Sequence, residues 1–368
     1  MGFCQEGGMK KVIFHIGPGK CGSSSIQHGL SALVDAGNPL SYRMVDPHLV
    51  RALEEPDDHA ARTKFSALLD HDLRRHAVAV YSHEMFFQRP AGIAAMVRLA
   101  AERADDIAVI GYSRRPSAFL QSAFCQWIFR SPDRAQENWD AALLRGLDPS
   151  LFSGLERHFI AAIATDFHSA RQLSGRLILK WAPVYDDIEA RIRPLGARLS
   201  VGTLPTAERP FSLMEDFLKR SAIALPPDMA GRRASNRQFD MDLIEAVHMA
   251  VLAEGFAPPP HRDNDHLERA SALLGKAESR DQPLLAMLKA CVDTLLWPQN
   301  RAFAARYGMA EDAFAPHRPV AAKQCWDAVA EAQRERATNS APLLADRDRM
   351  LARLGRLLYQ LQGDIPTD

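Results

Sequence analysis

The stretch KKVIFHIGPGKCGSSSIQ, residues 10–27, decides the fold. Its first part, up to His15, is apolar nearly throughout, as expected of a strand buried on both faces of a parallel sheet. A glycine-rich loop follows, and from Ser23 onward the sequence reads as a helix. In such an arrangement, backbone N–H groups and the helix N-terminus point to one place and favour a bound anion. The alternative is a glycine-rich turn with serine caps and no ligand.

The loop differs from that of a nucleotide triphosphatase in the position of its lysine. Gly17 and Gly22 satisfy the G-x-x-x-x-G spacing, but Lys20 lies inside the loop and Ser23 occupies the position at which such enzymes carry the lysine. The loop is therefore not a Walker A motif. The candidate binding residues share a backbone or side-chain donor at this loop: Gly19, Lys20, Cys21, Gly22, Ser23, Ser24 and Ser25.

Beyond this stretch, short apolar runs alternate with helical patterns and predict an α/β fold, a P-loop-type parallel sheet flanked by helices. The further strand candidates are 77–82, 106–113 and 176–182, with weaker ones at 40–45 and 198–204. After about residue 210 the patterns are helical only. We expect a disordered leader over 1–8, an α/β core over 9–250, and an all-helical C-terminal extension over 251–368 packed on that core.

Composition excludes several classes of protein. A chain of 368 residues, 47% hydrophobic, can bury a substantial core. Lys plus Arg number 45, as do Asp plus Glu, so the formal net charge is zero. The protein therefore has no overall charge that would attract it to nucleic acid or to a membrane surface. The five cysteines are scattered and lack CxxC spacing, which favours a reducing cytoplasmic location over a disulfide framework or a zinc site. No run approaches the ~20 apolar residues that span a bilayer.

A second motif, SRRPSAFLQS at 113–122, marks the end of a strand and the start of a helix. Arg114 and Arg115 stand where a triphosphatase strand would supply a magnesium-binding acid. A cationic strand end opposite a phosphate loop suggests a second anionic group on the ligand and no metal. Arg114 and Ser122 could hold one phosphate together. Alone, this motif would better fit an exposed arginine pair and a helix serine with no binding role.

Together, the two motifs resemble the sulfotransferases that use 3'-phosphoadenosine 5'-phosphosulfate (PAPS), especially the bacterial branch related to carbohydrate sulfotransferases. The first loop of that family typically reads HIGPPKTGTTSLQ, and HIGPGKCGSSSIQ follows it position by position, with Cys21 at a usual Thr or Ser. The family later shows Arg-x-Pro and a serine eight residues after the arginine, matched here by Arg114, Pro116 and Ser122. The resemblance spans roughly residues 10–240.

The resemblance implies transfer of a sulfuryl group from PAPS to an acceptor hydroxyl of a saccharide or glycolipid, with 3',5'-ADP as product and no metal. The loop backbone from Lys20 to Ser25 would hold the 5'-phosphosulfate, and Arg114 with Ser122 the 3'-phosphate. Lys20 would stabilise the charge that grows on the bridging oxygen. Arg233, in GRRASNRQF, resembles a late family segment near the nucleotide, although a basic surface loop would read the same.

The acceptor hydroxyl must lose a proton, and ligands of open α/β sheets bind at the carboxyl ends of strands. The run AVAVYSHEMFF places His83 and Glu84 at such an end. In the carbohydrate branch a glutamate after this strand commonly serves as base, and some relatives use a histidine. We favour Glu84 over His83; the alternative is that Glu84 is a helix cap or ion-pair partner.

Two other functions stay open at the level of sequence. A P-loop kinase would require magnesium and turn over ATP, and the missing GK[ST] and Walker B acid disfavour it. A nucleotide-binding module that has lost catalysis would bind 3',5'-ADP tightly and transfer nothing.

Overall fold

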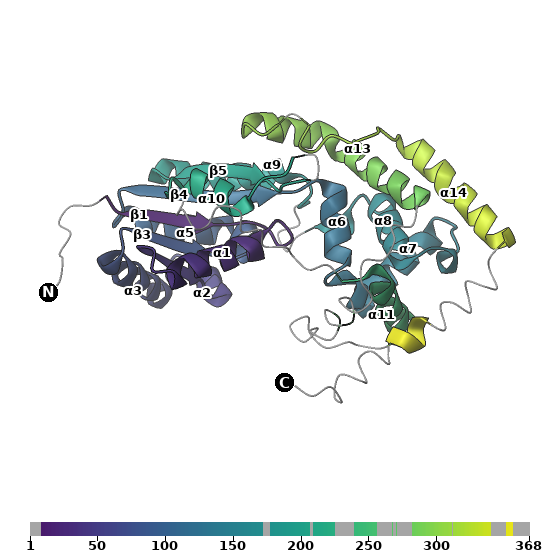
Figure 1. Cartoon of the computed structure of the whole chain (residues 1–368), viewed down its shortest axis with the longest axis horizontal. Coiled ribbons are helices and arrows are strands. Elements are labelled where there is room, and N and C mark those ends of the chain that lie inside the picture. The colour runs from purple at the N-terminus through teal and green to yellow at the C-terminus, as the bar shows by residue number, and fades with distance from the viewer. Residues whose placement is uncertain are drawn as a thin grey trace. The chain divides into compact units, whose positions relative to one another are not determined.

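A computed structural model describes residues 9–171, 177–206, 209–224, 239–255, 267, 270, 282–310, 312–339 and 351–355 (Figure 1). The leader predicted for residues 1–8 lies outside these ranges, and so does Arg233. The chain divides into two compact units. The first comprises Met1–Arg114, Gln172–Asn236 and Gln299–Ala313, and the second Arg115–Arg171, Arg237–Pro298 and Phe314–Asp368.

The first unit contains a five-stranded sheet in which every neighbouring pair of strands is parallel. Its strands are β1 (Lys11–His15), β2 (Leu40–Met44), β3 (Val78–Ser82), β4 (Asp106–Ser113) and β5 (Arg198–Thr203). They lie in the order β2-β3-β1-β4-β5. β1 is buried along its whole length, as its apolar sequence predicts. The predicted α/β class with a parallel sheet is therefore confirmed.

Strand register brings three carboxyl ends to one edge of the sheet. His15, the last residue of β1, pairs with Ser82 of β3 on one side and with Ile110 of β4 on the other. The chain runs from β1 toward β2 and β3 and then crosses to β4, so the strand order reverses between β1 and β4. Open α/β sheets bind ligands at such a switch point, outside the carboxyl ends of the strands.

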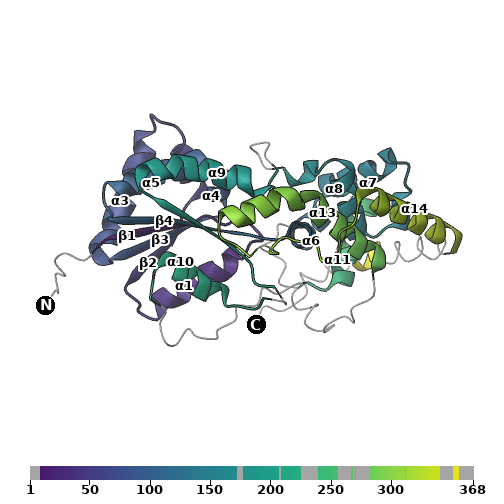
Figure 2. The ribbon, with the colours of Figure 1, turned by 90° about the horizontal axis from the view of Figure 1, so that it is seen from above.

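Helices cover both faces of this sheet (Figure 2). α1 (Ser23–Asp35) and α10 (Leu213–Ser221) lie on one face, and α5 (Pro90–Ala101) and α9 (Trp181–Ile192) lie on the other. α1 contacts α10, and α5 contacts α9 and α3 (His59–Arg75). The short helices α2 (Pro47–Ala52) and α4 (Met85–Gln88) follow β2 and β3. Both faces of the sheet are thus protected, which explains its apolar strands.

One predicted strand is wrong. Within 176–182, residues 178–180 form a turn and α9 begins at Trp181. Ile178 and Leu179 are buried, so the run is apolar for the same reason that a core strand is. A short, continuously apolar run has no period that separates a strand from the approach to a buried helix. The fifth strand is β5, the weaker candidate at 198–204, and β2 matches the weak candidate at 40–45.

The second unit consists mainly of helices in its described part. They are α6 (Pro116–Phe124), α7 (Pro132–Leu144), α8 (Gly154–Ala164), α11 (Met241–Glu254), α14 (Ala322–Asn339) and the part of α13 (Pro283–Arg306) up to Pro298. α13 begins in the second unit and ends in the first, and the division falls after Pro298, inside the helix. Helices predicted after residue 210 are confirmed at α10, α11 and α13.

A buried carboxylate ties two strands to α3. Asp72, on α3, is 2% exposed and accepts hydrogen bonds from Nε and Nη2 of Arg43 on β2, at 2.6 and 2.7 Å. The hydroxyl of Tyr81, on β3, donates to the same carboxylate at 3.0 Å. Burial alone would raise the pKa of Asp72, but the hydrogen bonds from Arg43 and Tyr81 bring it below the ordinary value.

We expect Asp72→Asn to lower the free energy of unfolding by about 1–3 kcal/mol, because it leaves Arg43 without its carboxylate partner. Urea unfolding near pH 7 measures the loss. The contribution of Asp72 is present above the pKa of an unfolded aspartate, about 3.9, and is lost as the pH falls through the lowered folded pKa. The difference between wild type and variant should therefore shrink in acid.

Asp70→Asn is the matched control on the same helix. Asp70 accepts a hydrogen bond from Arg103 at 2.9 Å, but its side chain is 46% exposed. Solvent screens such a pair, so its loss should cost under about 1 kcal/mol. Equal losses at the two positions would contradict a special role for the buried carboxylate.

Candidate functional site

The loop between β1 and α1 contains two residues in the left-handed backbone region. Lys20 has φ 69° and Gly22 has φ 82°. The backbone N–H of Cys21 donates to the Pro18 carbonyl at 3.2 Å, and that of Ile26 donates to the Gly22 carbonyl at 3.2 Å. A lysine in this region is strained, and strain of this kind concentrates at functional sites.

Gly22 is required for its backbone angle and for the space around it. A Cβ added there would lie 2.4 Å from Cδ2 of Leu213 and 2.8 Å from Cδ2 of Leu204. Gly22 is also the N-cap residue of α1, whose first turn is Ser23, Ser24 and Ser25 and holds no acidic side chain. The helix therefore begins with small donors and without a carboxylate that would repel an anion.

Three charged side chains gather around this loop, all from the first unit. Arg114, at the end of β4, donates from Nη1 to the carbonyl oxygen of Lys20 at 3.2 Å. Burial raises the pKa of the Cys21 thiol; the charges of Arg114 and Lys20 oppose this rise and that of Glu84 adds to it. Cys21 is thus a buried thiol rather than a reactive thiolate. The structure brings Lys20, Glu84 and Arg114 to the same loop.

The two base candidates differ in what their side chains already do. Burial raises the pKa of Glu84, and the charge of Lys20 opposes that rise. Burial lowers the pKa of His83, whose Nδ1 accepts a hydrogen bond from the backbone N–H of Met85 at 2.9 Å. A neutral histidine with Nδ1 so engaged carries its proton on Nε2 and has no lone pair left to accept another. This geometry favours Glu84 over His83 as a proton acceptor.

Next to the loop, hydrogen bonds link three polar side chains, an arrangement that the sequence does not predict. Nδ1 of His15 lies 2.8 Å from Oγ of Ser82, and Nε2 of Gln27 donates to the same hydroxyl at 3.1 Å. His15 is 1% exposed, and burial lowers its pKa to about 3, so the ring is neutral. The sequence places His15 at the end of the run that forms β1 and does not indicate its partners. Its partners depend on the pairing of β1 with β3 and on the direction of α1.

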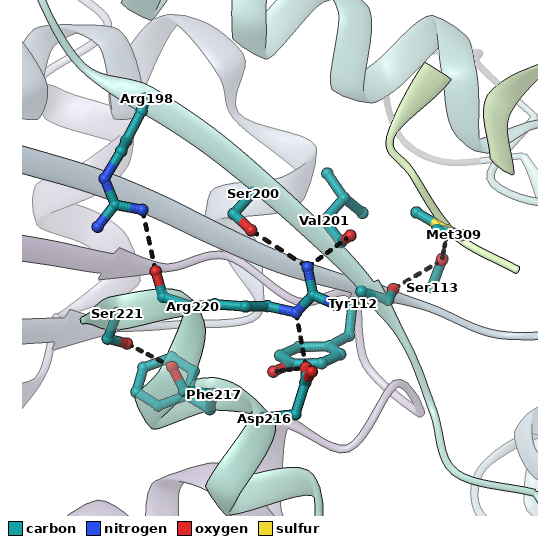
Figure 3. A network of polar contacts seen from close by, with 11 residues as sticks. Tyr112, Ser113, Arg198, Ser200, Val201, Asp216, Phe217, Arg220, Ser221 and Met309 are labelled. Atoms are coloured by element: carbon teal, nitrogen blue, oxygen red, sulfur yellow. Dashed lines mark hydrogen bonds and ion pairs between the residues drawn. The ribbon is translucent and has the colours of Figure 1, made fainter. Parts of the chain in front are cut away.

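α10, which supports the loop through Leu213, is fixed to the sheet by a second polar network (Figure 3). Nε of Arg220 donates to Asp216 at 2.6 Å, and the hydroxyl of Tyr112 on β4 donates to the same oxygen at 2.8 Å. Arg220 also donates from Nη1 to the carbonyl of Val201 on β5 at 3.1 Å. These bonds hold α10 against β4 and β5 and thereby keep Leu213 next to the loop.

Ser122 lies on α6, in the second unit. The first turn of this helix is already capped from α13, because Asp293 accepts hydrogen bonds from the backbone N–H and the hydroxyl of Ser117 at 2.9 and 2.7 Å. Burial raises the pKa of Asp293 to about 6. Arg114 belongs to the first unit, and its predicted pairing with Ser122 stays a prediction.

Comparisons of the chain with known protein families, with curated proteins and with solved structures found no match. Among the residues that the structure describes, no three His, Cys, Asp or Glu side chains gather so as to hold a metal ion. In the same part of the chain, every helix is too short or too polar to cross a membrane. The interpretation of the site therefore depends on its own geometry.

We expect Gly22→Ala to destabilise the protein more than Gly37→Ala. Both glycines have positive φ, 82° and 78°, so an alanine costs about 1–2 kcal/mol at either position. Nothing lies within 4 Å of a Cβ at Gly37, whereas at Gly22 the contacts with Leu213 and Leu204 add overpacking of about 1–3 kcal/mol. Urea unfolding of the two variants measures the difference. Equal losses would show that the leucines do not restrict this position.

Proposed function

We propose that the protein is a sulfotransferase that moves the sulfuryl group of PAPS to an acceptor hydroxyl of a saccharide or glycolipid. The observation that carries the proposal is the grouping of Lys20, Glu84 and Arg114 around a glycine loop at the carboxyl edge of a parallel sheet. The strand β4 is followed by an arginine where a magnesium-dependent kinase would need an acid. By this proposal the loop is a P-loop-type anion site.

On the donor side, the backbone N–H groups from Lys20 to Ser25 would surround the 5'-phosphosulfate. Negative charge grows on the bridging oxygen as its bond to sulfur breaks, and a positioned ammonium group at Lys20 would stabilise it. The Arg114 guanidinium, which already contacts the loop backbone, would bind the 3'-phosphate by charge-assisted hydrogen bonds. Ser122 remains the sequence-based candidate for a second donor to that phosphate.

On the acceptor side, Glu84 would take the proton of the attacking hydroxyl. The new bond joins the acceptor oxygen to sulfur, the bond from sulfur to the bridging oxygen breaks, and 3',5'-ADP leaves with that electron pair. Burial raises the pKa of Glu84 and makes its carboxylate a better proton acceptor, and the nearby Lys20 charge opposes that rise and favours the ionised form. The two opposing effects suit a carboxylate that must be charged at rest and basic in the reaction.

Nucleotide preference tests the donor. A ligand at 100 times its dissociation constant stabilises a protein by ~2.7 kcal/mol, so thermal shifts can rank 3',5'-ADP, 5'-AMP, ADP and ATP with magnesium. We expect 3',5'-ADP to give the largest shift. Arg114→Ala should reduce the shift by 3',5'-ADP far more than that by 5'-AMP, because only the former carries a 3'-phosphate.

Other outcomes of this comparison have definite meanings. The largest shift with ATP and magnesium, together with ATP turnover, would replace the proposal by a kinase. Tight 3',5'-ADP binding without transfer from PAPS to any saccharide or glycolipid in a broad panel would indicate a binding module without catalysis. Equal effects of Arg114→Ala on both nucleotides would contradict the proposal that Arg114 binds the 3'-phosphate.

Glu84→Gln should lower turnover by about 10²–10⁴-fold and leave 3',5'-ADP affinity nearly unchanged, because it removes only the base. The assay is transfer from radiolabelled PAPS to the acceptor panel, with nucleotide binding followed by calorimetry. Since the pKa of Glu84 is raised, its base form is lost as the pH falls through a value above that of an ordinary glutamate. The acid limb of kcat/KM should lie there and disappear in Glu84→Gln.

His83→Gln is the control for the neighbouring residue. His83 binds the backbone N–H of Met85 through Nδ1, so its loss should affect the start of α4 and lower turnover much less than the loss of Glu84. Full turnover in Glu84→Gln, with a large loss in His83→Gln, would reverse the assignment.

A further inference from the structure

The chain of Gln27, Ser82 and His15 beneath the loop has a direction. The Gln27 amide nitrogen can only donate, so the Ser82 hydroxyl accepts from it at 3.1 Å and retains its own proton to donate. Nδ1 of His15 lies 2.8 Å from that hydroxyl and takes this proton as acceptor. The neutral His15 ring then carries its hydrogen on Nε2, at the end of the chain that faces the loop.

Nε2 of His15 is buried and, among the residues that the structure describes, has no hydrogen-bond partner. The ring is 1% exposed and packs edge-on against Phe217, with ring centroids 5.6 Å apart. A Cβ built on Gly17 would lie 3.2 Å from Nε2 and 3.0 Å from Oγ of Ser23, so both atoms border the same small space. Buried polar atoms without partners are rare in native proteins and call for a specific explanation.

Ser23, on the other side of this space, is held only loosely. Its hydroxyl lies 3.4 Å from the carbonyl oxygens of Gly17 and of Pro18, at the long end of the hydrogen-bond range. Ser23 is the first residue of α1, where backbone N–H groups favour an anion. A small rotation of this hydroxyl can therefore exchange the loop carbonyls for a ligand.

We propose that His15 is a positioning residue for the anion loop, which donates Nε2–H to Oγ of Ser23 when an anion binds. Ser23 then turns its own proton from the loop carbonyls to the anion. Gln27, Ser82, His15 and Ser23 each donate to the next group, and the last donates to the ligand. Aligned hydrogen bonds polarise one another, so the chain presents a strengthened neutral donor to a phosphate or sulfate.

This inference rests on the proposed function only in that both place a phosphoryl or sulfuryl group at the loop. Pyrophosphate is the probe, because it occupies an anion loop without transfer chemistry. Calorimetry measures its affinity, and long-range nitrogen-15 spectra of histidine-labelled protein report the tautomer of His15. We expect the Nε2–H tautomer in the free protein and a shift of the Nε2 signal when pyrophosphate saturates the site.

Ser82→Ala should weaken pyrophosphate binding roughly twofold to tenfold, the effect of one lost hydrogen bond. The matched control is Ser221→Ala. Ser221 is also fully buried, but its hydroxyl donates to the Phe217 carbonyl at 2.6 Å and takes no part in the hydrogen bonds that link Gln27, Ser82 and His15. It should leave the affinity unchanged. Gly17→Ala fills the space between Nε2 and Ser23 and should abolish the response of the His15 signal. Thermal melts without ligand show that each variant is folded.

Several results would overturn the inference: an Nδ1–H tautomer in the free protein, an Nε2 signal that pyrophosphate does not move, or equal affinities of Ser82→Ala and Ser221→Ala. Failure of the wild-type protein to bind pyrophosphate would overturn it as well. A His15 response to pyrophosphate in a protein that transfers nothing from PAPS supports the inference and sinks the proposed function alone.

Discussion

The candidate site depends on the parallel pairing of β1 with β3 and β4. The backbone N–H of His83 donates to the His15 carbonyl at 3.3 Å, and that of Ile16 donates to the Ile110 carbonyl at 2.8 Å, so pairing continues to the points where the chain leaves the sheet. Because parallel strands end at one edge, residues that are distant in the sequence meet there. Lys20, Glu84 and Arg114 come from three different strand ends, and only this pairing brings them together.

Holding the loop in its strained form requires compensation. A left-handed lysine costs about 1–2 kcal/mol, and a hydrogen bond from a charged donor contributes about 1.5–3 kcal/mol. The bond from Arg114 to the Lys20 carbonyl is therefore large enough to offset the strain of the residue that it contacts. On the opposite side, Leu213 occupies the space that Gly22 leaves, and the bonds of Arg220 and Asp216 hold its helix in place. The loop is thus restrained from two directions by elements far along the chain.

Much of this arrangement can be predicted from sequence, because buried parallel strands are apolar throughout and glycine loops have few alternative uses. β1, the loop, α1 and the candidate Lys20 follow from the stretch 10–27, whereas the candidate Glu84 follows from the run that contains β3. The run at 176–182 is misleading because burial makes the approach to α9 as apolar as a core strand. The choice between Glu84 and His83 needs the bond from Met85, and the link of His15 to Ser82 needs strand register; neither interaction leaves a pattern in the sequence.

Lys20 connects the two halves of the proposed reaction. In the protein without donor, its charge opposes the burial that raises the pKa of Glu84. A bound phosphosulfate would bring negative charge to the same ammonium group, and the net stabilisation of the Glu84 carboxylate would fall. The pKa of Glu84 would therefore be higher while the donor is bound than in its absence. The acceptor hydroxyl would be activated when there is a sulfuryl group for it to attack, and the departure of 3',5'-ADP would restore the ionised carboxylate. One lysine inside the loop can therefore couple leaving-group stabilisation to the strength of the base.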